Sequence, residues 1–157
     1  VTFPVHPRTA ARLSSTGLDR ELEHPAVTLT GPVGYDVLLG ALASARLAVT
    51  DSGGIQEEAA HLGVPVVVLR GSTPRWAGVE AGTTTLAGLA DDRAAAAVLA
   101  AAAGHTSPEG QERAATVPCP YGDGTTGPQV AAVLADERTD ALLALDEPDY
   151  TDGRLPW

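Results

Sequence analysis

The stretch that decides the fold reads Thr50-Asp51-Ser52-Gly53-Gly54-Ile55-Gln56-Glu57-Glu58-Ala59. It follows an apolar run at residues 47–50, which predicts a buried strand, and it leads into a helix predicted over residues 55–62. Residues 51–54 are the predicted tight loop between them. Because the first backbone N–H groups of a helix have no partner inside the helix, this loop is expected to offer them to an anion.

The residue types of the loop suit a phosphate ligand. Ser52 can cap the helix or donate a hydrogen bond to a phosphate. Gly53 and Gly54 let the backbone approach a bulky diphosphate without a Cβ in the way. The same pattern is also typical of an ordinary strand-to-helix turn with a capping serine. The loop therefore predicts a diphosphate cradle and leaves the plain turn open.

Helix geometry, at about 100° per residue, separates the two adjacent carboxylates of the predicted helix. The helix is expected to bring three apolar side chains together on one face: Ile55, Ala59 and Leu62. Glu57 and His61 then point toward solvent as plain helix surface, whereas Glu58 lies at the edge of the apolar face. A carboxylate in that place needs donors, and the vicinal hydroxyls of a ribose one turn beyond a diphosphate supply two. Ribose binding by Glu58 is the specific hypothesis, and a salt bridge to a neighbouring arginine is the alternative.

Outside this stretch, short β-branched or apolar runs alternate with longer Ala- and Leu-rich segments, which is typical of βα units around a parallel sheet. Strands are expected at residues 1–5, 27–30, 47–50, 64–69 and 84–87. Helices are expected at residues 8–15, 35–45 and 55–62, from residue 91 and from about residue 128. The helix at 35–45 is expected to pack on the sheet through one face: Val37, Leu38, Ala41, Leu42 and Ala45. Residues 70–82 are expected to be a polar loop and the segment from 147 a loose tail.

Composition and charge exclude several classes of protein. The 157 residues suffice for one domain with a core but not for two such domains. A formal net charge of −10 repels phosphate backbones and anionic lipid, so neither nucleic-acid nor membrane-surface binding is expected.

The single Cys119 excludes an internal disulfide, and a soluble cytoplasmic protein is expected. The alanine-rich, lysine-free composition indicates a bacterial source, and a chain without methionine that opens on Val1 is expected to be a fragment.

Residues 50–59, followed by Leu62-Gly63-Val64-Pro65-Val66-Val67-Val68-Leu69-Arg70, resemble the bacterial non-hydrolysing UDP-N-acetylglucosamine 2-epimerases. Three further segments agree in order and spacing: Pro4-Val5-His6, Gly78-Val79-Glu80-Ala81-Gly82-Thr83 and Pro120-Tyr121-Gly122-Asp123-Gly124. The resemblance covers residues 1 to about 135. It implies a GT-B fold, in which two Rossmann-like domains face each other and the C-terminal one binds UDP. Residues 1–146 are then the Rossmann-like C-terminal domain, trimmed at its N-terminal side, and residues 147–157 are a loose tail.

The resemblance also implies a reaction. Family members are isomerases that interconvert UDP-N-acetylglucosamine and UDP-N-acetylmannosamine by eliminating UDP and adding it back after protonation on the opposite face of C2. No metal, nicotinamide or other cofactor is implied. The acids and bases that move the protons belong to the facing N-terminal domain, which is missing. A Gly-His-Arg-Arg-Glu segment, which carries a histidine and basic residues at the active site, is also missing, so no catalytic residue is assigned here. The fragment alone is expected to be inactive, and the full-length protein is expected to be a homodimer.

Carried over by position, Ser52 and Gly53 meet the diphosphate and Glu58 holds the ribose hydroxyls of the UDP-sugar. Arg75 matches an arginine that can neutralise diphosphate charge, with a solvated loop arginine as the alternative. Around it, the chain reads Thr73-Pro74-Arg75-Trp76-Ala77 where the family usually reads Thr-Glu-Arg-Pro-Glu. This difference changes the loop that carries Arg75.

Three further positions have a counterpart in the family. His6 matches a histidine that touches an activating UDP-sugar in regulated members, which makes it a possible allosteric residue. Tyr35 matches a common tyrosine and is expected to be a half-buried structural aromatic. Asp123, between two glycines, is expected to form the turn before the last helix. Two alternatives stay open: half of a UDP-sugar glycosyltransferase, and a non-catalytic domain that binds nucleotide-sugars.

Overall fold

The computed structural model describes residues 1–88 and 92–136, which fall into two units, one ending at Tyr121 and one beginning at Gly122. The first unit contains, in order, β1 (Thr2–Pro4), α1 (Pro7–Thr16), the 3-10 helix η1 (Leu18–Leu22), β2 (Thr28–Thr30), α2 (Tyr35–Ala43), β3 (Ala48–Thr50), α3 (Gly53–His61), β4 (Val66–Val68), α4 (Trp76–Glu80), β5 (Thr84–Leu86), α5 (Asp92–Thr106) and α6 (Pro108–Thr116). The second unit contains α7 (Thr126–Leu134). Within the described ranges, no helix has the length and apolar character needed to cross a membrane.

All paired strands of the first unit are parallel, as the alternating pattern predicts. β3, β4 and β5 form one sheet in that order, with Ala48 opposite Val66 and Val66 opposite Thr84. β1 and β2 form a second sheet, with Thr2 opposite Thr28. The α/β class with helices around parallel strands is therefore confirmed, although the strands belong to two sheets.

The division into two sheets follows from which strand edges are paired. The Ala48 N–H donates to the Pro65 carbonyl at 3.0 Å, and the Thr50 carbonyl accepts from the Leu69 N–H at 2.9 Å. Because alternate residues of a parallel strand face opposite edges, the N–H and C=O of Val49 point away from β4. No described strand pairs with that edge of β3, so the three-stranded sheet ends there.

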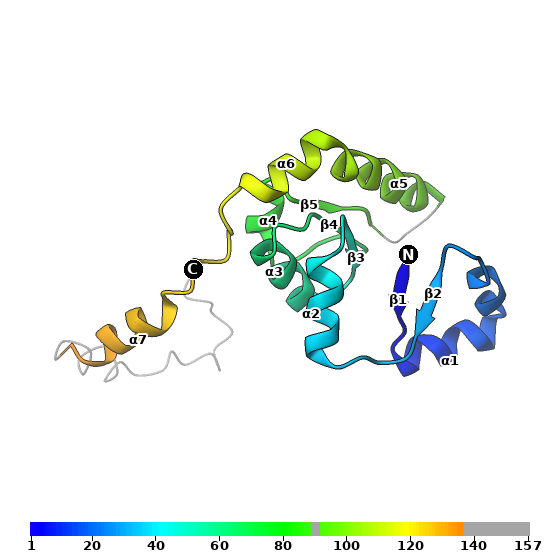
Figure 1. The fold of residues 1–157 in the computed structure, drawn as a ribbon, viewed down its shortest axis with the longest axis horizontal. Coiled ribbons are helices and arrows are strands. Elements are labelled where there is room, and N and C mark those ends of the chain that lie inside the picture. Colours follow the sequence, from blue (N-terminus) through cyan, green and yellow to red (C-terminus); the bar gives the residue numbers. More distant parts are fainter. Residues whose placement is uncertain (89–91, 137–157) are drawn as a thin grey trace, which may run out of the picture. The chain divides into compact units, whose positions relative to one another are not determined.

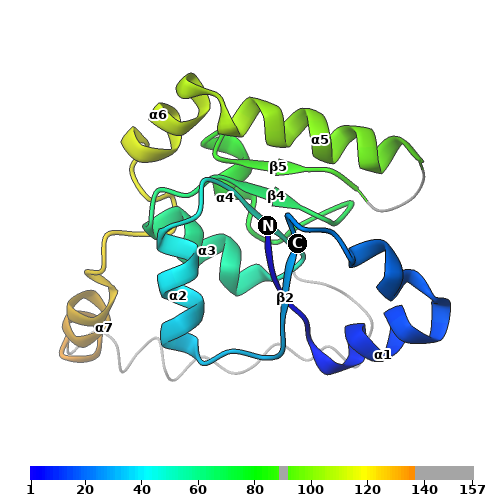
Figure 2. The same ribbon diagram turned by 45° about the vertical axis from the view of Figure 1, so that its right-hand side comes forward.

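The core lies around β4, the middle strand. Val66, Val67 and Val68 are almost completely buried, as expected for a parallel strand covered on both faces. Figure 1 and Figure 2 show α5 over one face of this sheet and α2 and α3 on the other. Ala59 of α3 is fully buried and belongs to the same cluster as Val66. At about 1.5–3 kcal/mol for each fully buried valine, this strand is a main source of stability.

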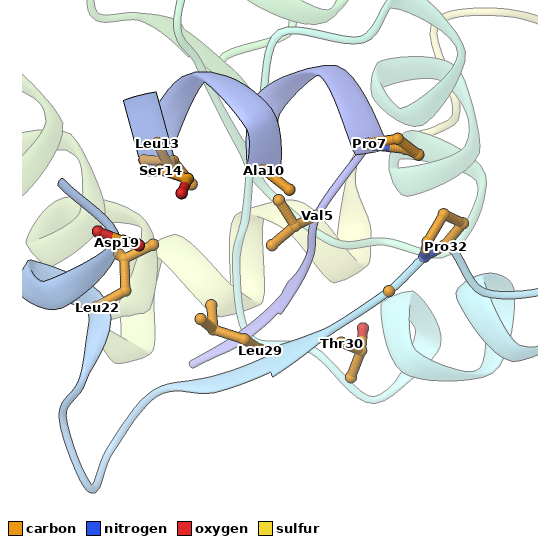
Figure 3. A pocket seen from close by; sticks show the side chains of 11 residues that line it. Val5, Pro7, Ala10, Leu13, Ser14, Asp19, Leu22, Leu29, Thr30 and Pro32 are labelled. Atoms are coloured by element: carbon orange, nitrogen blue, oxygen red, sulfur yellow. The ribbon is translucent and has the colours of Figure 1, made fainter. Parts of the chain in front are cut away.

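α1 covers β1 and β2. The helix ends at Gly17, which has a φ of 72° and returns its N–H to the carbonyls of Leu13 and Ser14, so the predicted stop is confirmed. A concavity of about 430 Å³ lies between α1, η1 and the two strands, and Figure 3 shows Val5 and Leu29 pointing into it. Its lining is largely apolar, because the side chains that α1 and η1 direct toward the two strands meet those of the strands there.

Several predicted boundaries are wrong for local reasons. The loop before α3 is shorter than expected, because Gly53 and Gly54 already have helical geometry and form the first turn. The polar loop at residues 70–82 contains the short helix α4. An additional helix, α6, begins after Ser107, whose hydroxyl accepts from the Gly110 N–H at 3.1 Å. A capping serine followed by proline is a recognised start signal.

The predicted packing face of α2 is correct only in part. Leu42 is buried in the core and Ala45, just past the helix, packs against it, whereas Val37 is 56% exposed and Ala41 is also exposed. α2 therefore contacts the sheet layer through its C-terminal end. The expected start of α5 at residue 91 and the expected tail from residue 147 lie outside the described residues.

In the second unit, the turn before α7 has the expected form. Gly122 and Gly124 have φ values of 114° and 87°, which a side chain would strain. Between them, Asp123 accepts hydrogen bonds from the hydroxyl and the N–H of Thr125. These bonds lower the pKa of the Asp123 carboxyl. The structural role predicted for Asp123 is confirmed.

Candidate functional site

The N-terminus of α3 follows directly from the end of β3. The Ser52 N–H donates to the Thr50 hydroxyl at 3.0 Å, and the Ser52 hydroxyl accepts from the Ile55 N–H at 3.4 Å. Ser52 is therefore the helix cap, and its own hydroxyl proton stays available for a ligand. The amides of Gly53 and Gly54 have no acceptor among the described residues. Two free N–H groups thus stand at the positive end of the helix dipole.

The two glycines lie between the charged groups of the site. A Cβ on Gly53 would lie 3.6 Å from Cζ of Arg75. A Cβ on Gly54 would lie 3.9 Å from Oγ of Ser52 and 4.0 Å from Oε1 of Glu58. These distances are ordinary contacts, so the glycines are not required by the packing of the protein alone. The five residues that the sequence predicts as substrate-binding are brought together around the first turn of α3.

Arg75 is held at both its backbone and its side chain. Its Nε lies 2.6 Å from Oε1 of Glu57, in an ion pair whose side chains are 36% and 41% exposed. Its N–H donates to the Thr73 hydroxyl at 3.1 Å, and its carbonyl accepts from the Tyr121 hydroxyl at 3.0 Å. The terminal nitrogens of the guanidinium have no acceptor within the described part of the chain. The guanidinium therefore combines a fixed position with free donors.

The ion pair corrects the prediction for Glu57. Its place on α3 indicated plain helix surface, but the loop between β4 and α4 carries Arg75 across to it. The alternative prediction to ribose binding was a salt bridge between Glu58 and an arginine, and the structure pairs the arginine with Glu57 instead. Within the residues described, Arg75 pairs with Glu57, and Glu58 has no ion-pair partner.

Tyr35, at the start of α2, lies beside Glu58. A hydrogen bond to the Glu58 carboxylate, followed by the negative charge of that carboxylate, raises the pKa of the Tyr35 phenol. Tyr35 is 63% exposed, so the prediction of a half-buried structural aromatic is wrong. Its hydroxyl and the carboxylate of Glu58 make a polar corner one helical turn away from the free amides.

Sequence reasoning missed two buried polar side chains beneath the site. Gln56 is 0% exposed and Thr73 is 3% exposed. The Gln56 amide nitrogen donates to the Ser52 carbonyl at 3.0 Å, and its oxygen accepts from the Thr73 hydroxyl at 2.9 Å. A local signal was present, because Gln56 and the buried Ala59 are three residues apart on α3 and therefore share a face.

Tyr121 was also missed as part of this arrangement. Besides donating to the Arg75 carbonyl, its hydroxyl accepts from the Gly78 N–H at 3.2 Å. Burial is the main cause of the raised pKa of the Tyr121 phenol. A Cβ on Gly78 would lie 2.5 Å from this hydroxyl oxygen, so the close approach requires glycine. Tyr121 thereby joins the segment before the second unit to the Arg75 loop.

The chain matches the model of the family described as UDP-N-acetylglucosamine 2-epimerase over residues 1–135. It belongs to this family. The UDP-N-acetylglucosamine 2-epimerase of Methanococcus maripaludis is 44% identical over 89 residues, which are 56% of this chain and 24% of the relative. The Escherichia coli K12 enzyme of the same name is 34% identical over 139 residues, 88% of this chain and 35% of the relative. The chain thus spans about a quarter to a third of the length of these 2-epimerases.

A solved structure of the family agrees with the fold. The Methanocaldococcus jannaschii UDP-GlcNAc 2-epimerase, in complex with UDP-GlcNAc and UDP, superposes with a TM-score of 0.71 at 33% identity. The match covers 85% of this chain and 34% of that one. The predicted fold class, a Rossmann-like α/β domain forming the C-terminal half of a GT-B fold, is confirmed by this family likeness.

His6, predicted from the sequence as a possible allosteric residue, lies at the start of α1. It is exposed and caps α1, with its Nδ1 accepting from the Arg8 N–H at 3.2 Å. This contact explains a histidine at the helix start by itself. An allosteric contact through His6 stays a prediction from the family resemblance.

Proposed function

We propose that this chain is the UDP-binding part of an isomerase that interconverts UDP-N-acetylglucosamine and UDP-N-acetylmannosamine. The observation that carries the proposal is the Arg75 guanidinium, held beside the free amides of Gly53 and Gly54. Family membership favours this function over the glycosyltransferase and binding-module alternatives. Because the chain spans only part of its relatives, the reaction itself is proposed for the full-length protein.

The diphosphate binds at the first turn of α3. Gly53 and Gly54 supply two N–H donors, the helix dipole supplies partial positive charge, and Ser52 supplies a hydroxyl proton. Arg75 adds a full positive charge through its free terminal nitrogens. A chain with a net charge of −10 needs such a local concentration of donors to hold a dianionic or trianionic group.

The ribose binds at Glu58. This carboxylate is one helical turn from the amides, is half-buried, and has no ion-pair partner among the described residues. Two vicinal hydroxyls can each donate to it, which is a charge-assisted arrangement. Tyr35 stands beside the carboxylate and can contact the same sugar. The site therefore recognises the nucleotide through its diphosphate and its ribose.

The same groups promote the reaction at its charged step. When the bond between C1 and the oxygen of the diphosphate breaks, the electron pair leaves with UDP and the diphosphate gains negative charge. Donors that are already oriented stabilise that charge without reorganising. The proton at C2 is moved by groups outside this chain, so the role of these residues is to hold UDP through elimination and return.

The test is a titration of the 157-residue chain with UDP by calorimetry, followed by an epimerisation assay of the full-length protein with UDP-N-acetylglucosamine. The expected result is UDP binding by the chain and turnover by the full-length protein. A chain that shows no heat with UDP, in a folded state verified by circular dichroism, would contradict the proposed site. A full-length protein that binds UDP without epimerising would replace the isomerase with a binding function.

We also propose, from the same family resemblance, that the full-length protein is a cytoplasmic homodimer. Family membership supports both parts of this proposal. Sedimentation velocity of the full-length protein tests the oligomeric state. A single species of monomer mass across the micromolar range would contradict it.

A further inference from the structure

Helix α3 and the loop that carries Arg75 are joined by two buried polar side chains. Gln56 comes from α3, and Thr73 comes from the loop between β4 and α4. Both are almost completely buried. Ala59, about one turn further along the same helix, is buried as an apolar residue. An apolar side chain could also occupy the position of Gln56, so a buried amide there needs an explanation.

The hydrogen bonds form an unbroken series from the helix cap to Arg75. The Gln56 Nε2 donates to the Ser52 carbonyl at 3.0 Å, and the Thr73 hydroxyl donates to Gln56 Oε1 at 2.9 Å. The same hydroxyl oxygen accepts from the Arg75 N–H at 3.1 Å. Because a buried donor or acceptor left without a partner is costly, each of these bonds depends on the next.

We propose that Gln56 and Thr73 are positioning residues that fix the Arg75 guanidinium beside the first turn of α3, where the diphosphate binds. The inference rests on the proposed function for its ligand, but the position of Arg75 is a property of the unliganded protein. Glu57 fixes the side chain of Arg75 through Nε, and the Gln56–Thr73 pair fixes its backbone through the N–H group. Without the Gln56–Thr73 hydrogen bond, the guanidinium keeps its charge but is no longer held beside the first turn of α3.

The residues next to Arg75 leave the placing of its loop to Thr73 and Tyr121. The chain reads Thr73-Pro74-Arg75-Trp76, so the residues next to Arg75 are a proline and a tryptophan that is 51% exposed. Among the described residues, neither neighbour makes a side-chain hydrogen bond that holds the loop. The hydrogen bonds that place the loop come from Thr73 on one side and from Tyr121 on the other.

The first experiment needs no ligand. In the 157-residue chain, the Arg75 Nε–Hε signal is identified in a ¹H–¹⁵N NMR spectrum by its loss in Arg75→Ala. We expect a signal displaced from the free arginine position and slow in exchange, because Nε donates to Glu57 at 2.6 Å. Thr73→Val, which keeps the shape but removes both hydrogen bonds of the hydroxyl, is expected to move the signal to the free position. Thr73→Ser, which keeps the hydroxyl, is expected to restore it.

The second experiment is a double-mutant cycle on UDP affinity. Thr73→Val is expected to weaken UDP binding on the order of tenfold, which is about 1.4 kcal/mol. In an Arg75→Ala background the same change is expected to have almost no further effect, because the group that Thr73 positions is gone. Gln56→Leu is expected to behave as Thr73→Val does, and Thr73→Val carries the test alone if Gln56→Leu does not fold.

Thr85→Val is the matched control. The Thr85 hydroxyl also makes a 2.9 Å hydrogen bond inside the protein, to Nε2 of His105, away from the site. This variant is expected to lower the melting temperature as Thr73→Val does while leaving both the Arg75 signal and the UDP affinity unchanged. A loss of UDP affinity that merely follows thermal stability would appear in this control as well.

The outcomes separate the two proposals. An unchanged Arg75 signal in Thr73→Val, or losses of UDP affinity that add fully in the double mutant, would overturn the positioning role. If the signal moves as expected but the parent chain does not bind UDP, the positioning of Arg75 stands and the proposed nucleotide site fails.

Discussion

Nε of Arg75 lies 2.6 Å from Oε1 of Glu57, so the cation beside the helix N-terminus is paired with an anion before any ligand arrives. The pair is more than one-third exposed on both sides. Exposed ion pairs contribute roughly 0–1 kcal/mol, so Glu57 does little for stability. Its main effects are to orient the guanidinium and to place a negative charge near the site of a negatively charged ligand.

Replacing Glu57 by glutamine separates these two effects. In Glu57→Gln the amide oxygen still accepts from Arg75 Nε, while the negative charge is gone. We expect UDP to bind about two- to threefold more tightly at low ionic strength, because one repulsive charge is removed. The gain is expected to disappear at about 0.5 M salt, where exposed charges are screened. Calorimetry at both salt concentrations checks this, and weaker binding at low salt would show that the carboxylate is needed for orientation.

The ribose assignment predicts that Glu58→Ala weakens UDP binding far more than a change at an ordinary surface carboxylate. Loss of an acceptor for two hydroxyls is expected to cost on the order of 10- to 100-fold in affinity. Glu112→Ala on α6 is the control, because this exposed carboxylate lies outside the site. Glu57→Ala is unsuitable as a control, since it also releases Arg75. Equal affinities of the Glu58 and Glu112 variants for UDP would contradict ribose binding.

Tyr35 offers a test of the same carboxylate without a ligand. A hydrogen bond to Glu58 and the charge of Glu58 both raise the pKa of the phenol, because each favours its neutral form. In Glu58→Gln the charge is absent, so Tyr35 is expected to lose its proton at lower pH than in the parent chain. The Cζ resonance of Tyr35, followed by ¹³C NMR across alkaline pH, reports this titration. Tyr35→Phe identifies the signal, and an unchanged titration in Glu58→Gln would mean that the two groups do not interact in solution.

Local chemistry explains which parts of the site the sequence predicts. Ser52, the two glycines and Glu58 lie within seven residues of one another, and helix geometry alone places Glu58 one turn beyond Gly54. The structure brings these residues together as expected. The same reasoning misjudged where the helix begins, because glycine reads as loop in a sequence although its φ here is ordinary.

The missed contacts are the ones that join distant parts of the chain. Thr73 reaches Gln56 across 17 residues, Arg75 reaches Glu57 across 18, and Tyr121 reaches Arg75 across 46. The periodicity of α3 assigns Glu57 to solvent, because it contains no information about the distant loop that brings Arg75 to Glu57. The pattern of parallel strands is likewise visible in the sequence, whereas their division into two sheets depends on which edges meet.

Gly53 provides a prediction in which stability and binding change in opposite directions. Its φ is not positive, and an added Cβ would lie in ordinary contact, 3.6 Å from Cζ of Arg75. Gly53→Ala is therefore expected to stabilise the free chain by up to about 1 kcal/mol, because alanine loses less backbone entropy in a helix. The same methyl group stands between the free amides and the guanidinium, where the diphosphate must approach, so UDP affinity is expected to fall at least about tenfold.

Gly40→Ala in α2 is the control for this prediction. An added Cβ at Gly40 has no neighbour within 4 Å, so this variant is expected to gain stability in the same way and to bind UDP as the parent chain does. Thermal unfolding gives the stability of both variants, and calorimetry gives their affinity. If Gly53→Ala bound UDP as well as Gly40→Ala does, the diphosphate would not lie against the first turn of α3, and the glycines there would be explained by the turn alone.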